Sequence, residues 1–118
     1  MSTEDSKNNP SHILHDLAEE RSLAYHRAVA SRLEAIPEIL QRARGRIERW
    51  IHERGRSVAY ARRWREILDR PIADIVAVLT SEDDEARALR QCTPFAGELS
   101  PRERWKLWRD VKESLNSE

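Results

Sequence analysis

The chain has 118 residues, a net charge of zero, 39% hydrophobic and 36% charged residues, and only three glycines. These values fit one helical domain with a modest core and broad charged faces, and they disfavour a β-sandwich or a barrel. No apolar run approaches the length of a membrane span, and the polar N-terminus is unlike a signal peptide, so we expect a cytoplasmic protein. We predict an all-α fold, a single compact bundle of five to six helices over residues 11–118, after a disordered tail at residues 1–10.

Apolar residues recur at three- and four-residue spacings along most of the chain, as they do on the buried face of a helix. The predicted helices run over about residues 11–36, 37–54, 57–70, 71–79, 81–91 and 101–115. The residues predicted to face inward are Leu14, Ala18, Tyr25, Val29, Leu33, Ile36, Leu40, Ala43, Ile47, Trp50, Ile51, Tyr60, Ala61, Trp64, Ile67, Leu68, Ile72, Ile75, Val76, Leu79, Ala86, Leu89, Trp105, Trp108, Val111 and Leu115.

Signals for helix ends separate these segments. Three prolines stand where a helix should begin, namely Pro37, Pro71 and Pro101. Ser100 is a predicted N-cap with Glu103 three residues later, as in a capping box, and Ser81 is a predicted N-cap of the preceding short helix. Gly55 fits a helix C-terminus. Gly45 lies in mid-helix at a cost of about 1 kcal/mol relative to Ala, which we interpret as room for close packing.

The segment over residues 89–108 contains the main break in helical pattern in the second half of the chain, and it holds the sole phenylalanine, Phe95. Pro94 disfavours the α region before it, so the preceding helix should end there. Gly97 can take a positive φ and turn the chain back. We interpret Phe95 as a plug in the core. The alternative is that the Pro-Phe-Ala-Gly loop is presented to a partner.

Charge is segregated along the chain although it sums to zero. Residues 42–65 hold nine basic and two acidic residues, a net +7, and residues 66–85 hold one basic and seven acidic residues, a net −6. The basic block can pair with the acidic block inside the fold or meet an acidic partner. Charge mainly provides specificity and on-rate, so aromatic anchors would have to add affinity. The residues that we assign to a partner surface are Arg42, Arg46, Arg49, Arg56, Arg63, Phe95 and Trp108.

A nucleic-acid-binding protein is the first alternative. The basic face between Arg42 and Arg65 is interleaved with aromatic residues, which can stack on single-stranded bases. The same aromatics occupy the apolar stripes, so we place them in the core. A helix–turn–helix over residues 72–91 is disfavoured, because its second helix would present the four carboxylates of residues 82–85 to the DNA backbone.

A ribonuclease is the second alternative, because Arg21 and His26 have the Arg-x4-His spacing of the HEPN ribonucleases, which are small helical dimers. In that family the motif lies late in the chain, whereas here it lies in the first predicted helix. A surface arginine beside a half-buried histidine is the plainer interpretation. His12 and His15 lack a further ligand for zinc, and Cys92 is expected to pack as a small hydrophobe, so we expect no metal and no cofactor.

Three segments, SLAYHRAVASRLEAI at residues 22–36, LRQCTPFAG at residues 89–97 and ERW at residues 103–105, resemble a group of small uncharacterised bacterial proteins. The resemblance spans about residues 12–110, and its most specific part is the pattern LRQxxPFAGxLSxxERW. It implies a place in small operons that resemble toxin–antitoxin modules, and it implies no activity. We therefore predict a non-enzymatic protein-binding module, such as an antitoxin-like or regulatory partner. A homo-oligomer is compatible with this pattern, because small helical domains often bury a leftover apolar stripe by dimerising.

Overall fold

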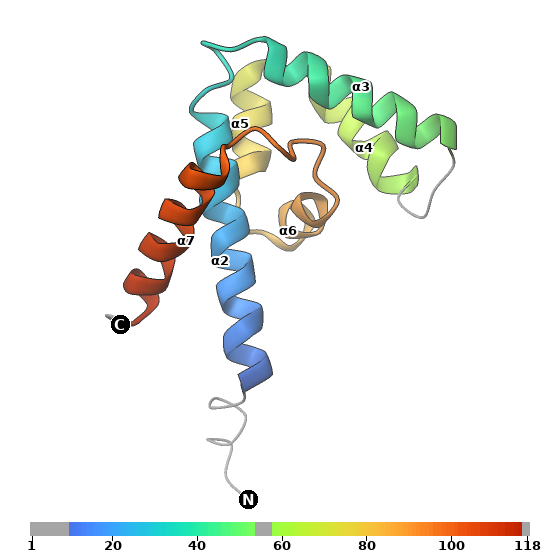
Figure 1. The fold of residues 1–118 in the computed structure, drawn as a ribbon. Coiled ribbons are helices and arrows are strands. Elements are labelled where there is room, and N and C mark those ends of the chain that lie inside the picture. The colour runs from blue at the N-terminus through green and yellow to red at the C-terminus, as the bar shows by residue number, and fades with distance from the viewer. Residues whose placement is uncertain (1–9, 54–57, 117–118) are drawn as a thin grey trace, which may run out of the picture.

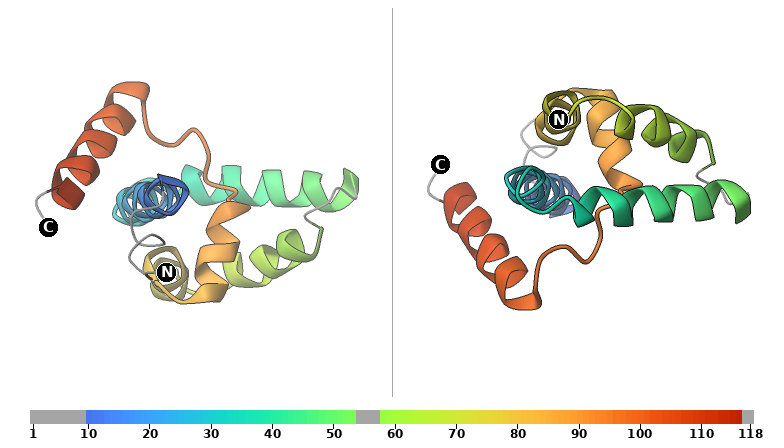
Figure 2. Two further views of the ribbon diagram at one scale, coloured as in Figure 1. Left: turned by 90° about the horizontal axis from the view of Figure 1, so that it is seen from below. Right: turned by 90° about the horizontal axis from the view of Figure 1, so that it is seen from above.

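Helix α2 lies at the centre of the molecule. The computed structural model describes residues 10–53 and 58–116. Helix α2 (Pro10–Ala30) packs against α5 (Ile72–Thr80), against the short helix α6 (Asp84–Gln91) and against α7 (Pro101–Asn116). Viewed along α2, helix α7 lies across α2 from α5 and α6 (Figure 2). Helix α2 therefore separates α7 from the rest of the bundle.

Helices α3 (Glu38–Glu53) and α4 (Val58–Leu68) pair with each other and extend to one side as an arm (Figure 1). Helix α5 connects this arm to the centre, because it contacts both α4 and α2. The segment between α6 and α7 crosses the molecule from beneath the arm to the top of α7 (Figure 1). This connection brings residues 92–99 against elements that are far away in the sequence.

The predicted all-α fold is confirmed, because the described residues form six α-helices and no strand. The tail predicted at residues 1–10 lies outside the described residues except for Pro10, which begins α2. The helix C-terminus predicted at Gly55 and the helix start predicted at residue 57 also lie outside the described residues. The first helix is shorter than predicted, because it ends at Ala30 and residues 31–35 form turns.

Helix α7 begins as the sequence predicts. Pro101 is its first residue, and Ser100 forms a reciprocal capping box with Glu103. The Ser100 N–H donates to the Glu103 carboxylate at 2.9 Å, and the Glu103 N–H donates to the Ser100 hydroxyl at 3.1 Å. Arg32 also donates to this carboxylate, and these hydrogen bonds lower the pKa of Glu103 to about 2.

Three other predicted starts are displaced by one or two residues. Pro37 and Pro71 directly precede α3 and α5, and Pro71 is the N-cap residue of α5, in an extended conformation at ψ 154°. Helix α6 is capped by Asp83 and not by Ser81, because the Asp83 carboxylate accepts from the Ala86 N–H at 2.8 Å. Ser81 instead donates its hydroxyl to Asp83 and accepts the Asp83 N–H.

The core is built from most of the predicted inward-facing residues and is centred on two aromatic rings. Trp64 and Phe95 are fully buried and meet edge to face, with ring centroids 5.8 Å apart. The Trp64 indole N–H donates to the Leu89 carbonyl at 3.0 Å, and the same carbonyl accepts the Cys92 N–H at the end of α6. Phe95 is therefore the core plug, and the interpretation of a presented Phe95 is wrong.

Several inward predictions are wrong. Trp105 is 68% exposed, Tyr60 is 42% exposed, and Ile36 and Ala18 also lie at the surface. Helical spacing alone cannot tell the centre of an apolar stripe from its edge, and these residues lie at edges. The buried aliphatic residues that the stripes missed are Leu23, Ile39 and Leu99.

Substitution by alanine should have opposite effects on stability at two of the glycines. A Cβ added to Gly45 in α3 meets nothing within 4 Å, so this glycine does not serve close packing. Gly45→Ala should raise the free energy of unfolding by about 0.5–1 kcal/mol. Gly97 has φ 78°, so Gly97→Ala should lower it by about 1–2 kcal/mol. Urea unfolding measures both, and a Gly97→Ala variant as stable as the parent would contradict the assigned turn.

Candidate functional site

The loop over residues 92–99 is held against α2 by one tyrosine hydroxyl. Tyr25 donates its hydroxyl to the Phe95 carbonyl at 2.6 Å and accepts the Glu98 N–H at 3.1 Å. The tyrosine ring is buried, so these bonds satisfy polar groups that water cannot reach easily. The loop is thus fixed on both sides of Gly97.

Two arginines that we assigned to a partner surface bind this loop. The Arg42 guanidinium makes two hydrogen bonds to the Glu98 carboxylate, at 2.6 and 3.0 Å. The Arg46 Nη1 donates to the Pro94 carbonyl at 2.8 Å. Both arginines come from α3, so their charge is used to fasten the loop to the arm.

The other basic residues of the predicted surface divide into three cases. Arg63 of α4 bridges Glu85 at 2.9 Å and Glu66 at 3.0 Å, so the basic block does pair with the acidic block inside the fold. Arg49 is exposed on α3 and makes no ion pair with any described residue. Arg56 lies outside the described residues.

Trp108 is half-buried and lines an open hollow between α2 and α7, which we call the α2–α7 hollow. Its volume is about 430 Å³, within the range of small-ligand sites. Its lining residues are Ala18, Arg21, Ser22, Tyr25, His26, Arg90, Thr93, Ala96, Gly97, Arg104 and Trp108. The hollow therefore joins three guanidinium groups, two aromatic rings and the anchored loop.

Arg90 is a fixed wall of this hollow. It is 5% exposed, and its Nη1 donates to the carbonyls of Val78, Leu79 and Ser81 at the end of α5. A cation is favourable there, because the helix C-terminus carries partial negative charge. Burial lowers the pKa of Arg90, and the like charge of Arg87 lowers it further.

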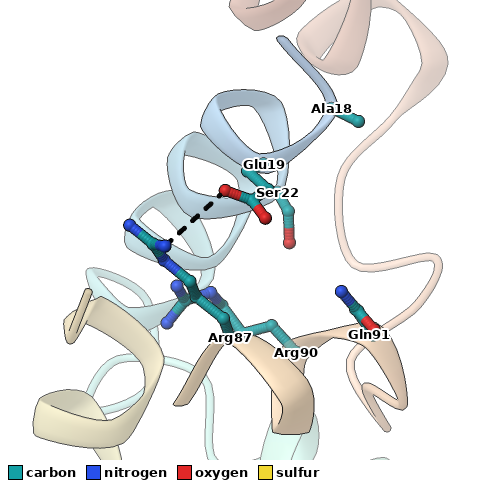
Figure 3. A pocket seen from close by; sticks show the side chains of 6 residues that line it. All are labelled: Ala18, Glu19, Ser22, Arg87, Arg90 and Gln91. Atoms are coloured by element: carbon teal, nitrogen blue, oxygen red, sulfur yellow. Dashed lines mark ion pairs between the residues drawn. The ribbon is translucent and has the colours of Figure 1, made fainter. Parts of the chain in front are cut away.

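A smaller pocket adjoins the hollow between α2 and α6 (Figure 3). Its volume is about 120 Å³, and it shares Arg90 with the hollow. Arg87 reaches across it towards Glu19, with 3.9 Å between nitrogen and oxygen (Figure 3). The carboxylate that lines this smaller pocket is thus already paired with a cation.

His26 lies at the floor of the hollow and is 2% exposed. Its Nδ1 lies 2.7 Å from the Ser22 carbonyl, which can only accept, so Nδ1 carries the hydrogen. Its Nε2 lies 2.7 Å from the Thr93 hydroxyl and accepts from it, and that hydroxyl in turn accepts the Phe95 N–H at 3.1 Å. Burial lowers the pKa of His26 to about 4, and the charge of Arg90 adds to the shift.

Both ring nitrogens of His26 are therefore engaged, and the ring is neutral at pH 7. Arg21 and His26 share the hollow, but the histidine faces Ser22 and Thr93 and not the open space. A general base needs a free nitrogen within reach of substrate. This geometry gives the ribonuclease interpretation little support.

Helix α7 exposes a second surface, which we call the Trp105 face and define as Arg102, Trp105, Arg109 and Lys112. All four residues are exposed. At about 100° per residue, the three cations lie within about 60° of Trp105 around the helix. The carboxylates of α7 lie at larger angles from Trp105 around the helix, at Glu103, Asp110 and Glu113. The sequence did not predict this face, because the apolar spacing along α7 assigned Trp105 to the buried residues.

Metal and membrane sites have no support in the described structure. No group of three or more His, Cys, Asp or Glu residues in the described part of the chain is placed to hold a metal ion. The side chains of His12 and His15 lie outside that part. None of the described helices is both long and apolar enough to cross a membrane.

Comparison with protein-family models, curated proteins and solved structures gave no match to this chain. The resemblance to small bacterial proteins therefore stays a prediction, and the site rests on its own geometry.

The buried neutral His26 should make stability depend on pH. Because the pKa of His26 falls from 6.5 to about 4 on folding, the unfolded chain binds more protons between these values. The contribution of neutral His26 to the free energy of unfolding is complete above pH 6.5 and is lost as the pH falls towards 4. The free energy of unfolding should drop by about 2 kcal/mol between pH 7 and pH 5. Urea unfolding across this range measures it.

The matched control is His26→Gln, which keeps a hydrogen-bonding side chain but cannot titrate there. This variant should lose most of the slope between pH 7 and pH 5. An unchanged slope in the variant would show that another group is responsible.

Proposed function

We propose that this protein is a non-enzymatic protein-binding module that meets an acidic partner surface through the Trp105 face. Its role would be that of an antitoxin-like or regulatory partner in the bacterial cytoplasm, as the operon context implied by the sequence resemblance suggests. The exposure of Trp105 is the observation that carries the proposal.

Helix α7 is the least buried helix in the described structure. It has no fully buried residue, and its apolar side is only half covered by α2. A groove of about 340 Å³ between α2 and α7 is lined in part by Leu107, Val111 and Leu115. A partner that covered this helix would bury apolar surface that the chain itself leaves open.

The chemistry of the Trp105 face fits a protein interface. Tryptophan and arginine are the residues that most often dominate binding energy at such interfaces. The three cations around Trp105 favour an acidic partner and would speed its association. Because Arg42, Arg46 and Arg63 are committed inside the fold, the partner surface moves from the arm to α7.

Nucleic-acid binding through the arm has weaker support. Trp64 is fully buried and cannot stack on bases, and Trp50 packs against the core. Arg49, Arg62 and Tyr60 are still exposed there. Binding through these residues is therefore an outcome that the experiment below must be able to reveal.

Site-specific photo-crosslinking tests the proposal. A benzophenone side chain at position 109 in cells that express the protein should yield a defined protein adduct, and the same probe at position 62 on α4 should not. With the captured protein purified, Trp105→Ala should weaken its binding at least tenfold, about 1.4 kcal/mol, by removing the anchor. Titration calorimetry measures this change.

Tyr60→Ala is the matched control, since it removes an exposed aromatic residue from another helix. It should leave binding within twofold, and both variants should unfold at the parent temperature. Equal binding by Trp105→Ala and the parent would contradict the proposal. Nucleic-acid adducts at position 62 would favour the arm instead.

A further inference from the structure

The α2–α7 hollow is lined by positive charge and by no carboxylate. Three of its lining residues are arginines, Arg21, Arg90 and Arg104, and none is acidic. Neither Arg21 nor Arg104 forms an ion pair with another described residue. The carboxylate of Glu19 in the adjoining pocket is paired with Arg87 (Figure 3).

Two of these guanidinium groups are held in place before any ligand arrives. Arg90 is fixed by three carbonyl groups through Nη1 alone, which leaves its other nitrogens without a hydrogen bond to any described residue. The Arg21 guanidinium carbon lies over the Trp108 ring, 5.8 Å from its centroid. Binding loses less entropy when the donors are already ordered.

Arg21 also has an unsatisfied donor. Its Nε is buried and has no hydrogen-bond partner among the described residues. A buried donor without an acceptor is costly, and such atoms are rare in folded proteins. The hydrogen-bonding capacity of Arg21 is therefore not used up within the described structure.

The chemistry of the lining selects the class of ligand. Guanidinium groups bind phosphate and carboxylate oxygens in a forked geometry, and three of them balance a dianion better than a monoanion. The Trp108 ring and the methyl groups of Ala18 and Ala96 offer apolar contacts beside the charges. We propose that the α2–α7 hollow binds a phosphate monoester, with Arg21, Arg90 and Arg104 on the phosphate and Trp108 beside the organic group.

This site is distinct from the Trp105 face. Arg104 and Trp108 line the hollow, whereas Arg102 and Trp105 do not. The proposal therefore does not depend on the proposed function, and each can fail alone.

Calorimetric titration of the full chain at pH 7.5 tests the proposal with matched probes. Phenyl phosphate, a dianionic monoester, should bind with a dissociation constant of about 1 mM or lower. Dimethyl phosphate, a monoanionic diester, and malonate, a dicarboxylate, should each bind at least tenfold more weakly. A phosphotyrosine peptide that binds more tightly than phenyl phosphate would indicate that the natural ligand is a phosphorylated protein. Equal affinity of the two probes would indicate a small-molecule phosphate ester.

Variants locate the binding. Arg21→Gln and Arg104→Gln should each weaken phenyl phosphate binding at least tenfold, and Lys106→Gln, on α7 but outside the hollow and the Trp105 face, should stay within twofold. If Arg21→Gln does not fold, the test rests on Arg104→Gln, because Arg104 is exposed and its substitution should not affect folding. Absence of binding, equal binding of malonate, or an unaffected Arg104→Gln variant would overturn the proposal.

Discussion

The structure depends on how residues 92–99 are fastened between α2 and the arm. Phe95 enters the core against Trp64, and the Tyr25 hydroxyl bonds to the Phe95 carbonyl and to the Glu98 N–H. Arg46 and Arg42 hold the same loop from α3. Residues of α2, α3 and α4, which are all distant from this segment in the sequence, therefore meet at it. The position of α7 follows from where the segment ends.

The sequence predicts much of this arrangement, because local signals decide it. The Ser100–Glu103 capping box, the proline at the start of α7 and the spacing of core residues such as Ile47, Trp64 and Leu79 all act within one helix. Phe95 could be placed in the core because the break in helical pattern left it no helical face. Such features depend on neighbours a few residues away, which a single sequence contains.

The pairing of charges could not be predicted, because it is decided over long separations. Arg42 and Glu98 lie 56 positions apart, and nothing in the basic block indicates that a loop near the C-terminus will use its charge. Trp105 and Trp108 have the same apolar character and similar spacing. The packing of α7 against α2 leaves Trp105 exposed and places Trp108 at the hollow. The exposed surfaces follow from these long-range contacts, since Arg42 and Arg46 are paired within the fold whereas Trp105 and the cations beside it on α7 stay exposed.

Amide hydrogen exchange at Phe95 and Glu98 tests the central claim most directly, because their N–H groups are bonded to Thr93 and Tyr25. If the loop is the fastening of the fold, both amides should exchange as slowly as those of buried helices. In Tyr25→Phe, the Glu98 amide should exchange at least tenfold faster than in the parent. Exchange in the parent at the rate of an unstructured peptide would contradict the account.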